Sequence, residues 1–187
     1  IDAAVTTAFA TGVLLPVWNG IGGGGMMVVH LESGGGGAID FGMQAPGSAH
    51  PEMYELENEL AVDGPSRRFS FPKVKDNANR DGYTAIAIPG TLAGLCTALE
   101  KWGTISLDQA IAPAAALARN GFPLPRTEAL TMSDRHDLLA RFEATRSIYL
   151  KNGSPLDVGA HFVQSDHADT LERIAANGPD ELYGGET

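Results

Sequence analysis

A run of glycine is the feature that most constrains how this chain folds. Glycine occupies residues 20 and 22–25, after an apolar helical pattern and before the apolar segment 26–31. Glycine loses more conformational freedom on folding than any other residue and adds no side-chain packing. Four consecutive glycines therefore suit a place where the backbone takes positive φ angles or lies close against another segment. The sequence predicts a helix, a glycine turn and a strand, in that order.

The composition is that of a globular domain and argues against two classes of partner. Of the 187 residues, 43% are hydrophobic and 19% are charged, which is enough for one domain with a real core. The formal net charge of −10 argues against nucleic acid and against anionic membrane surfaces as partners. No apolar run approaches the length of a membrane span, so membrane insertion is not expected.

Hydrophobic periodicity predicts a helix-rich chain with a β-hairpin near its start. The predicted helices cover residues 2–15, 89–101, 107–119, 131–145 and 165–177, and the predicted strands cover residues 26–31, 38–41 and 83–88. The glycine-rich loop of residues 32–37 joins the first two strands into the hairpin. Residues 42–80 carry four prolines and several polar runs, and a long irregular surface excursion is expected there.

Serine residues are predicted to cap two of the helices. Ser106 stands just before one helix, with Gln109 in its first turn, which is a capping pattern. Ser165 lies between His161 and His167 at the start of another helix. The spacing of these two histidines fits no zinc pattern, and an N-cap at Ser165 explains the cluster better. No metal site is predicted.

The residues by themselves show no complete catalytic constellation. A phosphate-binding P-loop needs Lys and then Ser or Thr after its glycines, but Met26 and Met27 follow them here. A dinucleotide fingerprint runs strand, glycines, helix, which is the reverse of this order. Cys96, the only cysteine, sits in an apolar helical pattern and is expected to be a buried structural thiol. No catalytic residue and no cofactor is predicted within the chain.

Five sequence blocks, in order, resemble one family. They are IDAAV (1–5) with GIGGGGMM (20–27), AIDF (38–41) with AP (45–46), IPGTLAG (88–94) with WGT (102–104), the segment 113–122, and IAANGPDELY (174–183). Together they are similar to the large subunit of the γ-glutamyltransferases. These N-terminal-nucleophile hydrolases are made as one precursor that cleaves itself into a large and a small subunit. The resemblance runs essentially from end to end.

The resemblance implies a fold and an activity. The fold is α+β, the helix-rich portion of a four-layer αββα sandwich, with residues 1–187 as a single domain of a large subunit that looks cut at both ends. The activity is acyl transfer or amide hydrolysis by an N-terminal Thr on a partner small subunit, with that residue's α-amino group as base. Thr187 matches no such motif and is not offered as the nucleophile. The implied substrates are small-molecule amides or γ-glutamyl compounds. The family suggests a periplasmic or extracellular location, with the cytoplasm left open.

One position departs from the family's pattern. After residues 38–41 the family normally carries an Arg that grips the α-carboxylate of the γ-glutamyl group, but Gly42 and then Met43 stand here. A hydrogen and a methionine do not replace a bidentate guanidinium clamp. We therefore predict that Gly42 and Met43 bind the substrate. We also predict that the enzyme handles γ-glutamyl substrates poorly and prefers a less charged acyl group, as in the related acylases.

Two alternatives stay open at this point. Arg67, Arg68 or Arg80 in the long excursion is a possible substitute charge for the missing Arg, because arginine is preferred at carboxylate sites. The second alternative is a different class of protein, a non-catalytic family relative that serves as a binding or assembly module.

Overall fold

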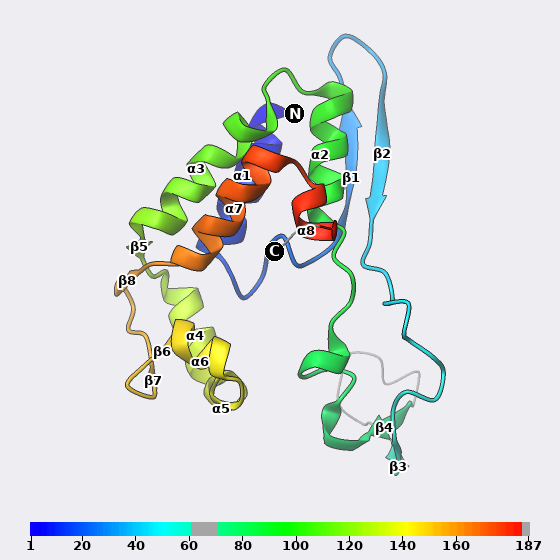
Figure 1. Ribbon diagram of the computed structural model, residues 1–187, viewed down its shortest axis with the longest axis vertical. Coiled ribbons are helices and arrows are strands. Elements are labelled where there is room, and N and C mark those ends of the chain that lie inside the picture. The colour runs from blue at the N-terminus through cyan, green and yellow to red at the C-terminus, as the bar shows by residue number, and fades with distance from the viewer. Residues whose placement is uncertain (61–70, 185–187) are drawn as a thin grey trace. The chain divides into compact units, whose positions relative to one another are not determined.

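The computed structural model describes residues 1–60 and 71–184 (Figure 1). The chain divides into two compact units, one of Ile1–Met43 with Pro89–Thr187 and one of Gln44–Ile88. Among the described residues, no helix is long and apolar enough to cross a membrane. The expectation of a single domain over residues 1–187 stays a prediction.

The larger unit consists of helices and a hairpin. Its elements are α1 (Asp2–Leu14), β1 (Gly25–His30), β2 (Gly36–Phe41), α2 (Thr91–Trp102), α3 (Leu107–Asn120), β5 (Phe122–Pro123), α4 (Arg126–Asp134), α5 (His136–Arg141), α6 (Glu143–Tyr149), β6 (Leu150–Lys151), β7 (Ser154–Pro155), β8 (His161–Phe162), α7 (Ser165–Asn177) and α8 (Asp180–Gly184). The predicted first helix, the hairpin, and the helices α2, α3 and α7 are confirmed to within two residues at each end.

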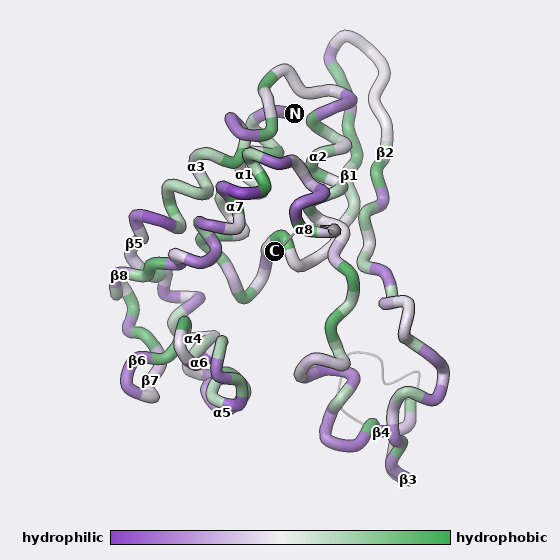
Figure 2. Tube along the Cα trace, viewed as in Figure 1, coloured by the Kyte–Doolittle hydropathy of each residue, from purple (hydrophilic) through white to green (hydrophobic). Residues whose placement is uncertain are grey.

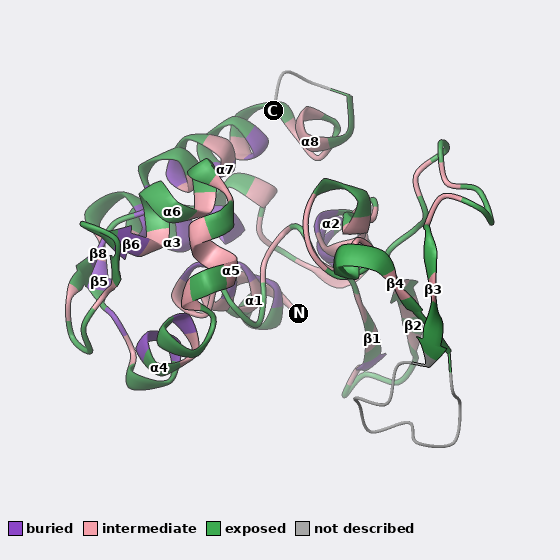
Figure 3. Cartoon of the chain, turned by 90° about the horizontal axis from the view of Figure 1, so that it is seen from below, coloured by how far each residue is buried: buried purple, intermediate pink, exposed green. Residues whose placement is uncertain are grey.

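Helices α1 and α7 pack against α3, and these three helices hold about half of the buried core (Figures 1 and 3). One face of α1 is buried, with Val5, Phe9 and Val13 at most 2% exposed. The buried stripe of α3 consists of Ala110, Ile111, Ala114, Ala115 and Ala118. Because alanine side chains are small, they allow neighbouring helices to approach closely. The core therefore depends on small residues at the helix contacts.

The start of α3 confirms the predicted cap. The side-chain oxygen Oε1 of Gln109 accepts hydrogen bonds from the backbone N–H and from the hydroxyl of Ser106, each at 3.0 Å. The first of these bonds satisfies the backbone N–H of Ser106, just ahead of the first helical turn, as in a capping box.

The predicted N-cap at Ser165 is wrong by one residue. Ser165 is the first helical residue of α7, and Gln164 before it has non-helical backbone angles (φ −127°, ψ 68°). The Gln164 side chain makes no cap bond. Its Nε2 instead donates to the carbonyl oxygen of Val13 at 2.8 Å, in a buried contact. The start of α7 is thus tied to the end of α1.

The single helix predicted over residues 131–145 is instead parts of three helices, α4, α5 and α6. The chain leaves helical geometry at Arg135 and again at Phe142, which has extended angles (φ −112°, ψ 129°). Neither α5 nor α6 has a fully buried residue, so no continuous apolar face holds one long helix together. The hydroxyl of Thr145 donates to the carbonyl oxygens of Leu139 and Phe142, at 2.8 and 3.0 Å, and stabilises the second break.

The smaller unit has more regular structure than the irregular excursion predicted for it. It contains β3 (Leu56–Leu60), β4 (Pro72–Val74) and the 3₁₀ turns η1 (Lys75–Asn77) and η2 (Tyr83–Ala85). Strands β3 and β4 pair antiparallel. The prediction missed this pair because prolines and polar residues hide the alternation of apolar and polar side chains that marks a strand.

The strand predicted over residues 83–88 is wrong. Gly82 takes a positive φ of 94° and begins the turn η2, which its carbonyl closes by accepting the Ala85 N–H at 3.1 Å. The hydroxyl of Tyr54 donates to the carbonyl oxygen of Thr84 at 2.8 Å. In a strand, that carbonyl would instead accept a backbone N–H of a neighbouring strand. Only Ile88 pairs in strand fashion, in an isolated bridge with Gln44.

The hairpin carries apolar side chains on both of its faces, with Asp40 and His30 also on the exposed one. Strand β1 pairs antiparallel with β2, and Met27 and its partner Ile39 are partly buried against the core. Met26 and Val28 point to the other face and are 81% and 85% exposed. Figure 2 shows β1 as largely apolar. Strands with apolar residues on both faces are typical of sheets that are covered on both sides.

We expect Gln164→Leu to lower the free energy of unfolding by about 1–3 kcal/mol, because the buried Val13 carbonyl loses its partner. Urea titration of the full-length protein measures this change. Asn177→Ala is the matched control, since it removes an exposed amide bond to Glu181, and we expect it to cost under about 0.5 kcal/mol. Equal losses in the two variants would contradict a special role for the buried contact.

Candidate functional site

The glycine turn is a place of close backbone contact rather than of unusual backbone angles. Positive φ angles occur in the hairpin loop but at none of the glycines in residues 20–25. A Cβ atom on Gly24 would lie 2.8 Å from the backbone nitrogen of Met43 and 2.9 Å from the carbonyl oxygen of Phe41. A Cβ on Gly25 would lie 2.8 Å from the Phe41 ring. Of the two reasons that the sequence allowed, close approach is the one that holds, at two of the four consecutive glycines.

The start of α2 joins this contact. The carbonyl oxygen of Gly23 accepts hydrogen bonds from the backbone N–H groups of Gly90 and Thr91, at 2.8 and 3.1 Å. A Cβ on Gly90 would lie 2.1 Å from the carbonyl oxygen of Phe41 and 3.0 Å from that of Gly42. Three segments therefore meet at one place, which we call the glycine junction. It comprises residues 23–25, 41–43 and 90–91.

Phe41 anchors the junction, and sequence reasoning missed it. Its ring lies against α2, where a Cβ on Gly94 would come within 2.2 Å of the ring atom Cγ. Gly90 and Gly94 are four residues apart and so share one face of the helix. That spacing is the sequence signal that would have indicated a close contact on this face of α2. Phe41 meets it from an inward position in β2. The anchored ring fixes where β2 ends.

Gly42 and Met43, the predicted substrate-binding residues, follow directly after β2 at the junction. Both are exposed, with Met43 at 59%. The backbone N–H of Gly42 donates to Oδ1 of Asp40 at 3.0 Å. A Cβ on Gly42 would meet only that same oxygen, at 3.3 Å, so the position has room for a side chain. Substrate binding by these two residues stays a prediction.

None of the possible substitute charges lies among the described residues of the larger unit. Arg80 is an exposed residue of the smaller unit. Arg67 and Arg68 lie outside the described residues, as does Thr187. The question of a replacement for the family's Arg therefore stays open.

Cys96 is buried on α2, as predicted. Burial raises the pKa of its thiol to about 11, and the nearby Glu100 carboxylate adds to the effect. The thiol is therefore protonated at neutral pH, and a protonated thiol is not a nucleophile. Among the described residues, no group of three or more His, Cys, Asp and Glu side chains is arranged to hold a metal ion.

Glu128 is a fully buried carboxyl group that sequence reasoning missed. Its Oε2 accepts the backbone N–H of Val17 at 3.3 Å. Within residues 1–60 and 71–184, its other oxygen has no hydrogen-bond partner. The contact ties the segment that leads into the glycine turn to helix α4. Glu128 therefore helps to place the turn rather than lining the junction.

The family model for Gamma-glutamyltranspeptidase matches residues 1–187. The chain belongs to the γ-glutamyltranspeptidase family. Among its relatives, the acylase ACY 1 proenzyme of Pseudomonas sp. (strain SE83) is 40% identical over 99% of this chain and 32% of that protein. The glutathione hydrolase proenzyme of Bacillus subtilis (strain 168) is also 40% identical, over 99% of this chain and 30% of that protein. The chain thus spans about a third of the length of these relatives.

Solved structures of the family confirm the fold. The Helicobacter pylori γ-glutamyltranspeptidase matches with a TM-score of 0.87 and 34% identity, over 99% of this chain and 50% of that one. The Pseudomonas nitroreducens enzyme, complexed with L-DON, matches with a TM-score of 0.83 and 31% identity, over the same shares. The predicted family and the α+β fold of N-terminal-nucleophile hydrolases are therefore confirmed.

We expect Gly24→Ala to lower the free energy of unfolding by about 1–3 kcal/mol, because the added methyl group would overlap the Met43 backbone. Gly22→Ala is the matched control in the same turn, since nothing lies within 4 Å of its Cβ position. It should leave stability within about 0.5 kcal/mol of wild type. Urea unfolding of the two full-length variants makes the comparison, and equal stability of both would argue against close packing at Gly24.

Proposed function

We propose that the protein containing this chain is a γ-glutamyltransferase-like acyltransferase or amide hydrolase that prefers acyl groups without the α-carboxylate of glutamate. The proposal rests on Gly42, which the resemblance aligns with the family's Arg, within a chain that the family model matches from end to end. The relatives at 40% identity include both an acylase and a glutathione hydrolase, so similar proteins are named for more than one activity.

The catalytic group in this proposal lies outside the chain. An N-terminal Thr on the partner small subunit attacks the amide carbonyl carbon through its hydroxyl oxygen, and its own α-amino group accepts the proton. The amine leaves with that proton, and the acyl group stays on the Thr as an ester. Water or a second amine then attacks the ester and releases the acyl group. The word proenzyme in the names of both relatives supports a precursor that is cleaved into subunits.

The hairpin is the part of this chain that we assign to the subunit contact. Met26 and Val28 leave exposed apolar side chains on the outer face of β1, and neighbouring exposed apolar groups are a feature of interaction surfaces. The small subunit is the proposed cover. A periplasmic or extracellular location belongs to the same proposal and rests on the family alone.

The specificity follows from the chemistry of the junction. A carboxylate on the substrate needs charged or strong hydrogen-bond donors, and arginine supplies two in parallel. Gly42 offers only backbone, and the exposed side chain of Met43 offers an apolar surface. An uncharged or aliphatic acyl group suits these two residues better than a γ-glutamyl group does.

The first test is the intact mass of the full-length gene product under denaturing conditions, with N-terminal sequencing. We expect two polypeptides, of which the smaller begins with Thr. Precursor kept in denaturant from the time of synthesis is the control and should stay uncleaved, because self-cleavage needs the folded site. A single uncleaved polypeptide from folded protein would overturn the proposed mechanism and favour a binding or assembly module.

The second test is Gly42→Arg in the full-length enzyme. We expect kcat/KM for a γ-glutamyl anilide to rise about 10-fold to 100-fold, which corresponds to hydrogen bonds between two charged groups. Activity on an uncharged acyl anilide should not rise. Gly42→Ala is the matched control, since it adds a side chain at the same position without a charge. The specificity proposal fails if the wild-type enzyme already cleaves γ-glutamyl anilides as readily as neutral ones.

A further inference from the structure

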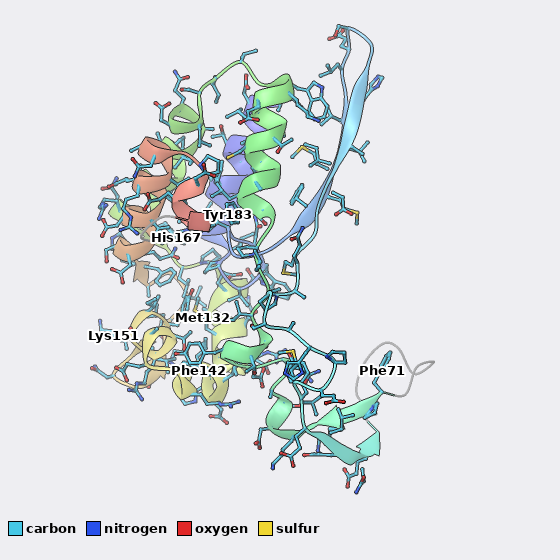
Figure 4. The ribbon with its side chains drawn as sticks, turned by 45° about the vertical axis from the view of Figure 1, so that its right-hand side comes forward. Phe71, Met132, Phe142, Lys151, His167 and Tyr183 are labelled. Carbon is cyan, nitrogen blue, oxygen red and sulfur yellow. The ribbon has the colours of Figure 1, made fainter. Side chains whose placement is uncertain are left out.

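Tyr183, on helix α8, binds the first turn of α2 with its hydroxyl group. The hydroxyl donates to the carbonyl oxygen of Pro89 at 3.0 Å and accepts the backbone N–H of Ala93 at 3.2 Å. Figure 4 shows Tyr183 between α8 and the end of α2 where that helix begins. The two partners lie on either side of the helix start, so one phenol bridges it.

The first turn of α2 needs such a group because its N-cap residue has no side chain. The N-cap is Gly90, and no side chain of α2 caps the helix start. Ser, Thr, Asp or Asn at this position would satisfy an N–H group of the first turn. None of them fits, since a Cβ on Gly90 would lie 2.1 Å from the carbonyl oxygen of Phe41. The close contact at the junction thus excludes a local cap, and Tyr183 provides one from a distance.

The position of Tyr183 depends on the turn after α7. Gly178 takes a positive φ of 86° and ends α7. Its carbonyl oxygen accepts the N–H of Glu181 at 3.2 Å, and that of Pro179 accepts the N–H of Leu182 at 3.1 Å. These bonds fold α8 back against α2. The hydroxyl of Tyr183 therefore connects the core helix α7 to the glycine junction.

We propose that Tyr183 is a positioning residue for the substrate site. It holds the first turn of α2, and with it the Gly90 backbone that lies against Phe41 and Gly42. The effect on substrate rests on the proposed function, because it assumes that Gly42 and Met43 contact the acyl group. The effect on α2 does not.

Hydrogen–deuterium exchange of the full-length Tyr183→Phe variant tests the contact itself. We expect the backbone N–H of Ala93, in peptides covering the first turn of α2, to exchange about tenfold faster than in wild type. Tyr54→Phe is the matched control, because it removes a phenol bond to the Thr84 carbonyl in the smaller unit. It should leave exchange in α2 unchanged. Unchanged exchange in Tyr183→Phe would overturn the proposal.

Steady-state kinetics of the same two variants test the positioning role. We expect Tyr183→Phe to raise KM for the preferred amide substrate about fivefold and to leave kcat within about twofold, since the nucleophile is on another subunit. Tyr54→Phe should leave both constants unchanged. Faster exchange with an unchanged KM would reduce Tyr183 to a structural cap and overturn the positioning role. A wild-type protein without amide-cleaving activity would overturn the proposed function, while the exchange result would still decide the contact.

Discussion

Contact between backbone segments at the glycine junction is the constraint on which the larger unit depends. Gly24 lies against the backbone of Phe41 and Met43, and Gly90 lies against that of Phe41 and Gly42. Backbone can pack this closely only where no Cβ intervenes. The carbonyl of Gly23 then fixes the start of α2, so the turn, the end of β2 and the helix start form one assembly. The hairpin and α2 take their places from it.

The junction also explains why the functional proposals concern neighbouring residues. The half-buried ring of Phe41 fixes the point where β2 ends, and Gly42 follows it at the surface with space for a side chain. In the proposed function, Gly in place of Arg at this position alters the charge offered to a substrate without disturbing the packing beneath it. The same close contact removes the local cap of α2, which gives Tyr183 its role. In that proposal packing depends on Phe41 and specificity depends on Gly42, so the two are separable.

The sequence predicted those elements whose signals are local and strong. The apolar face of α1, the capping pair Ser106 and Gln109, and the hairpin were all readable because each depends on residues within one or two turns. The misses have physical causes. Helices α5 and α6 bury no residue fully, so the hydrophobic pattern of residues 131–145 carried no signal for the breaks at Arg135 and Phe142. Gln164 took the N-cap position because its side chain binds Val13, which is 151 residues away in sequence.

The sequence by itself determined the family, through five blocks in order. It also showed that the glycine run serves one of two purposes, either positive φ angles or the close approach of another backbone segment. Only the tertiary structure decided between the two, because glycine satisfies both equally well and the decisive neighbours, Phe41 and Met43, belong to another segment. It also decided the role of Tyr183, whose partners Pro89 and Ala93 lie 94 and 90 residues away. Contacts of that separation follow from how helices pack, and no local pattern of residues encodes them.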